Sequence, residues 1–452
     1  MHSKAKQYAP EFRRQMVELH RAGTGSSKRI ETGARAMAAG TTRHPRRVLP
    51  YEQQAHRRRP HSPCDELASA AMCRIASTTS YERGIREMMN PNTQKLHDLG
   101  QSLWLDNITR ELLVNGALAR YISAMSVTGL TSNPTIFEHA IGHGNFYDEA
   151  IGNLAREGKS GEDLFFTLAL EDLRDAADLF RPAFEASAGV DGWVSLEVSP
   201  LLADDTAKTI HAAARQHTAA ARPNLFIKIP GTPAGIPAIE ASIFAGVPIN
   251  VTLLFSREHY LAAAEAYLRG IERRITAGLD PKVASVASLF VSRWDVAAND
   301  KLSPPYHNRL GIAIAMRTYK AYRDLLGSAR WQKLAIAGAL PQRLLWASTG
   351  TKDPAASDTL YIEALAAPDT IDTIPEKTLH ALADHGKVGA AMPVGGGDAE
   401  AVLAELRHEG IDDNALAAQL QREGTAAFSK SWSVLLSSIA KKSSQLAVAP
   451  SK

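Results

Sequence analysis

Several common features are scarce or missing in this chain of 452 residues, and each absence excludes a class of protein. The only two cysteines, Cys64 and Cys73, support neither a disulfide scaffold nor a thiolate metal site, and they fit a reducing compartment. No run of about 18 or more apolar residues occurs, so we expect no membrane span. The N-terminus lacks the apolar segment of a secretory signal, so we expect a cytoplasmic protein without a membrane partner.

Metal-ligand spacings are also missing. The 15 histidines are scattered and form no His-Glu-x-x-His pattern, so we expect no metal centre. The composition, 45% hydrophobic and 22% charged, is that of a globular protein with an ample core.

Basic residues are concentrated at one end of the chain. Residues 1–87 contain 17 Lys and Arg against 8 Asp and Glu, whereas the remainder carries 34 against 40. Residues 1–22 resemble the opening of the helix-turn-helix subunit of an insertion-sequence transposase, but no recognition helix follows. A nucleic-acid-binding arm is therefore one hypothesis, and we favour a basic leader without a fold, because binding motifs need a complete fold to place their side chains.

We accordingly predict three parts: a basic leader over residues 1–87, disordered or foreign to the native protein, an organised body over 88–446, and a tail over 447–452. Met88 and Met89 are candidate native starts.

The body alternates short apolar runs with helical patterns, which predicts eight strands and a (β/α)8 TIM barrel. A doubly wound open sheet is the alternative, but it calls for a glycine-rich turn after the first strand, where Asp106 and Asn107 stand instead. Extra helices are expected near 376–386, 398–408, 413–423 and 425–440. The predicted strands are 102–106, 127–134, 192–198, 224–230, 247–256, 283–292, 343–349 and 369–375.

One strand carries an unusual lysine. Lys228 stands in NLFIKIP between Ile227 and Ile229, as in a strand buried on both faces. An ammonium taken out of water tends to lose its proton, and a neutral amine attacks carbonyl groups. The alternative is a lysine that extends past its neighbours to water. Alternation along the strand places Lys228 on the face of Phe226, inside the barrel, which favours the first reading.

Other polar residues stand where predicted strands end, which is where barrel enzymes place their chemistry. One lysine with carboxylates, amides and hydroxyls on successive strands indicates a Schiff-base site, in which a carboxylate shuttles protons. The set is Asp106, Thr131, Ser132, Asn133, Glu197, Lys228, Asn250, Thr252, Ser288, Arg293 and Ser348.

The motifs GLTSNPTIF, WVSLEV, NLFIKIPGT, INVTLLFS and ASLFVSRWD together resemble bacterial transaldolase, of the class I Schiff-base kind and the long subfamily, over about residues 90–440. The resemblance implies a cofactor-free pentose-phosphate enzyme with sugar-phosphate substrates. It would move a dihydroxyacetone unit from sedoheptulose 7-phosphate to glyceraldehyde 3-phosphate, giving erythrose 4-phosphate and fructose 6-phosphate. The barrel would bind no nucleic acid, and a homodimer is one candidate assembly.

The resemblance also implies roles for single residues. Lys228 matches the Schiff-base lysine, Asp106 the carboxylate that takes the C4 hydroxyl proton, and Glu197 with Thr252 the pair that acts through a water. The substrate-binding positions, holding hydroxyl or phosphate groups, fall on Thr131, Asn133, Asn250, Ser288 and Arg293.

Two positions bear on the reaction in more detail. Gly350 stands where better-known members carry a second phosphate-binding arginine, so Lys352, with Ser348 nearby, is the expected substitute. Related fructose 6-phosphate aldolases typically have glutamine and tyrosine at the positions of Glu197 and Phe290. An apolar ring at Phe290 excludes water and favours transfer over simple cleavage, which stays the alternative activity.

Overall fold

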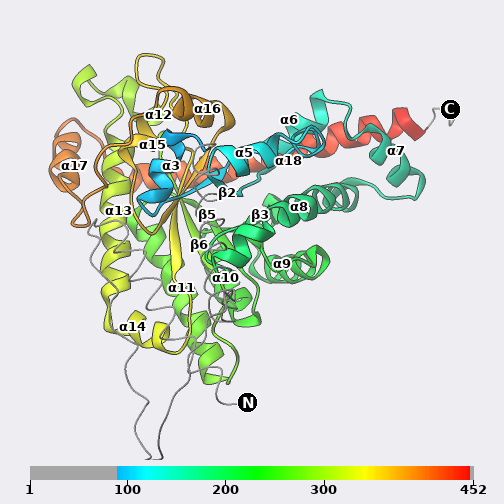
Figure 1. Ribbon diagram of the computed structural model, residues 1–452, viewed down its shortest axis with the longest axis horizontal. Coiled ribbons are helices and arrows are strands. Elements are labelled where there is room, and N and C mark those ends of the chain that lie inside the picture. The colour runs from blue at the N-terminus through cyan, green and yellow to red at the C-terminus, as the bar shows by residue number, and fades with distance from the viewer. Residues whose placement is uncertain (1–88, 448–452) are drawn as a thin grey trace, which may run out of the picture. The chain divides into compact units, whose positions relative to one another are not determined.

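The computed structural model describes residues 89–447 (Figure 1). The predicted leader and the tail beyond residue 447 lie outside these residues. Eight parallel strands form one sheet, which confirms the predicted number and order. They are β1 (Ser102–Leu105), β2 (Val127–Leu130), β3 (Val194–Glu197), β4 (Leu225–Pro230), β5 (Ile249–Leu254), β6 (Ser285–Phe290), β7 (Gln342–Ala347) and β8 (Thr370–Ile374).

The sheet curls into a nearly closed barrel. Its strand order is β2-β1-β8-β7-β6-β5-β4-β3, so β2 and β3 form the two edges. Backbone hydrogen bonds join these edges: Gly192 N donates to Thr128 O at 3.0 Å and Leu130 N to Trp193 O at 2.9 Å. Joining the edges satisfies backbone groups that an open sheet would expose. The (β/α)8 prediction is therefore confirmed, and the open-sheet alternative is wrong.

Helices surround the barrel and connect its strands. The first half contains α3 (Pro91–Asp98), α4 (Arg110–Val114), α5 (Ala117–Ala124), α6 (Pro134–His143), α7 (Asp148–Arg156), α8 (Gly161–Ala186), α9 (Thr206–Ala220) and α10 (Gly235–Ala245). The second half contains α11 (Arg257–Thr276), α12 (Ser292–Ala298), α13 (Leu310–Gly327), α14 (Ala329–Ile336), α15 (Leu360–Ala364), α16 (Glu376–His385), α17 (Ala399–His408) and α18 (Asp413–Ala447). Short 3-10 turns lie at Pro200–Leu202, Asn299–Lys301 and Pro304–Tyr306.

The strands end earlier than the apolar runs predicted, because polar residues at their ends begin the next helices. Asn133 caps α6 by accepting a hydrogen bond from Ile136 N at 3.1 Å, and Ser256 caps α11 by accepting one from His259 N at 3.1 Å. Caps of this kind satisfy backbone N–H groups that have no partner within the helix. The predicted strands 127–134 and 247–256 are thus too long.

The end of the chain also differs from its prediction. The two helices expected at 413–423 and 425–440 are one helix of 35 residues, α18. Gly424, which lies between the two expected helices, is itself helical. A Cβ atom there would lie 2.9 Å from Leu253 and 3.2 Å from Arg293 Nη1, so the glycine allows the helix to approach the barrel closely. In Figure 1, α18 (red) continues from the barrel along α6 and α7.

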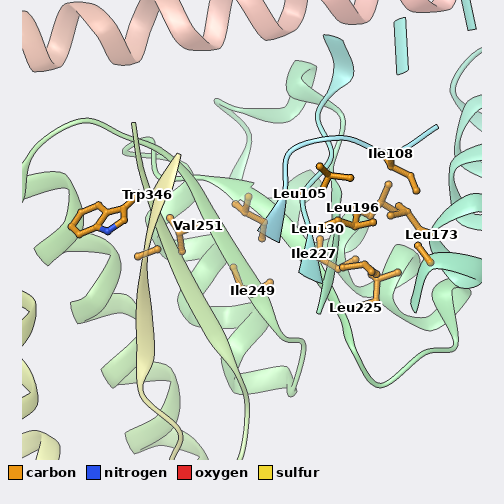
Figure 2. Close-up of a cluster of buried hydrophobic side chains, with 14 of the residues drawn as sticks. Leu105, Ile108, Leu130, Leu173, Leu196, Leu225, Ile227, Ile249, Val251 and Trp346 are labelled. Atoms are coloured by element: carbon orange, nitrogen blue, oxygen red, sulfur yellow. The ribbon is translucent and has the colours of Figure 1, made fainter. Parts of the chain in front are cut away.

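The main hydrophobic core lies between the strands and the helices. Leu105, Leu196, Ile227 and Val251 belong to this core together with Leu173 of α8 and Trp346 of β7 (Figure 2). All six residues of β4 are buried, as the pattern around Lys228 predicted for a strand covered on both faces.

A second hydrophobic cluster includes aromatic rings of the barrel strands and apolar residues of several helices. Trp193 stacks on Phe226 with ring centroids 4.0 Å apart, and Trp104 lies 6.2 Å from Phe226. Gly129 makes room for the Trp104 indole, because a Cβ atom at this position would lie 2.7 Å from it. These rings pack inside the barrel, and barrel enzymes place their sites at the carboxyl ends of the strands. No helix of residues 89–447 is long and apolar enough to cross a membrane.

Candidate active site

A cleft of about 1060 Å³ opens at the carboxyl ends of the strands. It contains most of the polar residues that the sequence singled out. Nine of the twelve predicted site residues line it: Asp106, Thr131, Asn133, Lys228, Ser288, Phe290, Arg293, Ser348 and Lys352. The other three, Glu197, Asn250 and Thr252, lie on β3 and β5, the strands on either side of the lysine strand β4.

Lys228 lines the cleft, and Glu197 lies buried directly beside it. They are direct partners in the β3–β4 register, and Lys228 Nζ lies 3.5 Å from a Glu197 carboxylate oxygen. The ammonium also donates a hydrogen bond to the Ser132 carbonyl oxygen at 3.2 Å. Both side chains are nearly inaccessible, with 6% and 4% of their surfaces exposed. The alternative, in which Lys228 extends past its neighbours to water, does not fit this burial.

The carboxyl group of Glu197 has a raised pKa. Burial raises its pKa to about 7, although the neighbouring Lys228 acts in the opposite direction. Neither carboxylate oxygen accepts a hydrogen bond from the described residues. The hydroxyl of Thr252, at the end of β5, is likewise buried and has no partner there. A carboxyl group with a pKa near neutral can both give and take protons under ordinary conditions.

Asp106 lies in the same cleft at the end of β1. Burial raises its pKa, while the positive charge of Lys228 and a hydrogen bond from Thr131 lower it. Thr131 donates that hydrogen bond at 3.0 Å, and its hydroxyl lies 2.6 Å from that of Thr373 on β8. Asp106 is thus a carboxyl group that lines the cleft, held by the Thr131 hydroxyl, which in turn contacts Thr373 of β8.

The two predicted amides have different surroundings. Asn250 is fully buried: its Nδ2 donates to Ser195 Oγ at 3.1 Å, and its Oδ1 accepts from Ser288 Oγ at 2.7 Å. Because these bonds orient the Asn250 amide, one of its N–H bonds stays free for another acceptor. Asn133 uses its oxygen to cap α6, which leaves its NH₂ group as the part available to the cleft.

Positive charge gathers at another part of the cleft. Arg293, half-buried at the start of α12, lies over the Phe290 ring with its guanidinium carbon 5.1 Å from the centroid. Burial lowers its pKa, and no ion pair or hydrogen bond of its guanidinium is found among residues 89–447. Lys352 is exposed at the same cleft, and a Cβ atom at Gly350 would lie 3.6 Å from its Nζ. Two cations that line the same cleft suit a phosphate group.

The amino-acid sequence is similar to known proteins whose activity fits this geometry. A family described as Transaldolase/Fructose-6-phosphate aldolase matches residues 103–439. The chain belongs to this family. A transaldolase of Parafrankia sp. (strain EAN1pec) is 45% identical over 360 residues, covering 78% of this chain and 98% of the relative. Transaldolases of Thermobifida fusca (44% over 361 residues, 78% and 98%) and Thiobacillus denitrificans (44% over 355 residues, 77% and 99%) are similarly related.

The cleft of this family member also contains residues that the sequence did not indicate. Thr373 is a strand-end hydroxyl of β8 and could have been found by the rule that found Thr131. Ser292, whose hydroxyl lies 2.9 Å from that of Ser348, stands one residue before Arg293. Phe428 comes from α18, some two hundred residues after Lys228, and nothing in its local sequence marks it. No group of three or more His, Cys, Asp or Glu among residues 89–447 is placed to hold a metal ion.

Proposed function

We propose that this protein is a pentose-phosphate transaldolase that works through a Schiff base on Lys228. It transfers a dihydroxyacetone unit from sedoheptulose 7-phosphate to glyceraldehyde 3-phosphate, giving erythrose 4-phosphate and fructose 6-phosphate. The observation that supports this most strongly is the Lys228 amine at the cleft floor, 3.5 Å from a carboxyl group whose pKa is about 7. The family match and the transaldolases at 43–45% identity support the same activity.

Imine formation needs a nucleophile and a proton carrier. The Lys228 amine adds to the C2 ketone, and the carbinolamine loses water to give the protonated imine. Glu197 protonates the departing hydroxyl and later removes a proton from the water that hydrolyses the imine. The Thr252 hydroxyl, buried and without a partner in the described part of the chain, assists by binding that water.

Carbon–carbon cleavage needs a base at the C4 hydroxyl. Asp106 takes this proton, the C3–C4 bond breaks, and its electrons move into the imine to leave a neutral enamine on Lys228. Erythrose 4-phosphate departs. When glyceraldehyde 3-phosphate arrives, the enamine carbon attacks its aldehyde and Asp106 returns the proton to the new hydroxyl. A carboxyl group held by Thr131 at 3.0 Å keeps its orientation through both half-reactions.

The remaining cleft residues are assigned to binding. Asn133 and Asn250, with Thr131 nearby, hold the hydroxyl groups of the dihydroxyacetone unit. Arg293 and Lys352 hold the phosphate, since a guanidinium offers forked donors to phosphate oxygens. Ser288 supports this part of the cleft by orienting Asn250, and Ser348 contributes a hydroxyl beside Ser292.

The second candidate activity is simple cleavage of fructose 6-phosphate. Two features favour transfer. Phe290 lines the cleft as an apolar ring and donates no proton to the enamine. The second feature is Glu197, where such aldolases typically have glutamine. Steady release of dihydroxyacetone from fructose 6-phosphate without an acceptor would favour the aldolase.

Borohydride trapping tests the proposal directly. Incubation with fructose 6-phosphate and borohydride should reduce the imine to a stable amine and add the mass of the dihydroxyacetone unit or the whole sugar to the peptide that contains Lys228. The Lys228→Arg variant should acquire no adduct, and the exposed Lys377→Arg variant should behave as the parent chain. A parent enzyme without an adduct under assay conditions would contradict the mechanism.

Three parts of the proposal are separate from the chemistry. A cytoplasmic location and a homodimer stay predictions, which cell fractionation and sedimentation of the full chain test. The division of the chain at residue 87 stays a prediction as well. The intact set of Lys228, Asp106 and Glu197 argues against a barrel that serves only as a scaffold for a nucleic-acid-binding leader.

A further inference from the structure

The C-terminal helix α18 contributes one side chain to the cleft, Phe428. Its ring lies over both functional cations: the centroid is 5.9 Å from Lys228 Nζ and 5.8 Å from the guanidinium carbon of Arg293. Phe428 is 5% exposed and belongs to the same apolar cluster as Phe255 and Phe290. The Phe428 ring therefore lies over both the lysine amine and the guanidinium that is proposed to bind phosphate.

The position of this ring is set by one face of α18. Gln421, Gly424, Phe428 and Trp432 follow one another at intervals of three or four residues, so they lie on the same side of the helix. Gln421 Nε2 donates to Gly231 O at 3.1 Å and to Leu253 O at 3.0 Å, which attaches the helix to the ends of β4 and β5.

A second attachment lies on the other side of the ring. Trp432 Nε1 donates to Glu162 Oε1 at 2.9 Å, and Ser199 Oγ donates to the same oxygen at 2.6 Å. Phe428 is thus held between two hydrogen-bonded points, and the absence of a Cβ atom at Gly424 lets the helix lie close to Arg293.

The ring has two physical effects at this place. An aromatic face attracts a cation, and the attraction is stronger where the pair is removed from water. Phe290 and Phe428 both contact Arg293, so they hold a guanidinium that has no ion pair in the described structure. The ring also occupies space above Lys228 that water would otherwise reach.

We propose that Phe428 is a positioning residue that keeps the lysine-bound enamine from hydrolysis and aligns Arg293 with the substrate phosphate. The inference rests on the proposed transaldolase reaction. Phe290 is proposed to exclude water from the site, and Phe428 gives the same role to a helix outside the barrel repeats.

The competing reaction defines what Phe428 prevents. If water reaches the enamine, C3 takes a proton from it, and the resulting hydroxide adds to C2 of the iminium. The proton of the new C2 hydroxyl passes to the nitrogen, the C2–N bond breaks, dihydroxyacetone leaves as the ketone, and Lys228 regains its amine. One water is consumed and no oxidant or reductant is needed. The product ratio between dihydroxyacetone and transferred ketose therefore reports how well the site excludes water.

The test is a series of substitutions at Phe428 in the full chain. The measured quantity is the rate of dihydroxyacetone release from fructose 6-phosphate without acceptor, divided by the transfer rate with erythrose 4-phosphate. This ratio should rise about tenfold or more in Phe428→Ala, and Phe428→Val should give an intermediate value. Phe428→Leu should retain most water exclusion. All three should show a raised KM for phosphorylated acceptors and a smaller change for unphosphorylated glyceraldehyde, because Arg293 loses one of its two aromatic contacts. Val434→Ala, at an exposed position of the same helix, is the matched control.

The outcomes separate this inference from the proposed function. An adduct on Lys228 in the parent and the variants, with an unchanged product ratio in Phe428→Val and Phe428→Ala, overturns the role of Phe428 and leaves the transaldolase proposal intact. Absence of an adduct in the parent overturns the transaldolase proposal. Phe428→Leu and Phe428→Val remove volume in steps, so the trend can be measured even where the alanine variant folds poorly.

Discussion

Replacing Glu197 by glutamine should slow both imine formation and imine hydrolysis. Glutamine has nearly the same shape as the carboxyl group but cannot exchange a proton near neutral pH. Proton transfer by a well-placed group is worth about 10²–10⁴ in rate. We therefore expect kcat of Glu197→Gln to fall by about 10²- to 10⁴-fold, which corresponds to roughly 3–5 kcal/mol of barrier.

The structure also predicts a change in the pH profile. The pKa of Glu197 is raised to about 7 by burial, against the influence of Lys228. At the observed 3.5 Å separation, two unit charges attract by roughly 5 kcal/mol at an effective dielectric constant of about 20. The parent kcat/KM should change slope near pH 7, where the carboxyl group passes from acid to base. The glutamine variant should lack this change.

Two assays measure the effect. Steady-state transfer from fructose 6-phosphate to erythrose 4-phosphate gives kcat and KM across neutral pH, and the rate of borohydride inactivation gives imine formation alone. Glu185→Gln, an exposed position on α8, is the control and should match the parent. If Glu197→Gln kept a kcat within about threefold of the parent and the same inflection near pH 7, the assignment of Glu197 as proton carrier would be wrong.

Two further predictions concern other parts of the barrel. Lys352→Ala should raise KM for phosphorylated substrates about two- to fivefold with little loss of kcat, because an exposed cation contributes modestly to binding. The control variant Lys377→Ala, at another exposed lysine, should change neither constant. Unchanged constants in Lys352→Ala would remove Lys352 from the site. Burial raises the pKa of Asp372, on the outer face of β8, to about 8, despite a hydrogen bond from Thr349. Because the unfolded chain releases this proton near pH 4 and the folded chain holds it, the free energy of unfolding falls as pH rises through that window. Asp372→Asn should therefore gain in Tm over the parent more at about pH 8 than at about pH 5, and a gap that is constant between them would contradict the raised pKa.

Much of the fold could be predicted because its signals are local. Eight apolar runs of strand length, each followed by a helical pattern, gave the correct strands and the barrel. The errors fall where local pattern and tertiary contact compete. Asn133 and Ser256 were included in strands but cap helices, since a cap depends on the N–H groups that follow it.

The candidate site likewise has features that follow from local sequence and features that depend on contacts between segments. Lys228 could be singled out from its own neighbours, because a charged residue is rarely buried in a strand unless it has a partner. Its pairing with Glu197 depends on the register between β3 and β4, and the pKa of Glu197 depends on how completely the surrounding strands exclude water. Neither property belongs to a single segment.

The sequence by itself therefore determined the eight strands, the face of β4 that holds Lys228 and the polar residues at the strand ends, because alternation and turn chemistry act over a few residues. Only the tertiary structure decided how the barrel closes between β2 and β3, that α18 continues through Gly424, and that Phe428 lies over Lys228 and Arg293. These features arise from contacts between segments far apart in the chain, for which the local sequence carries no period or motif.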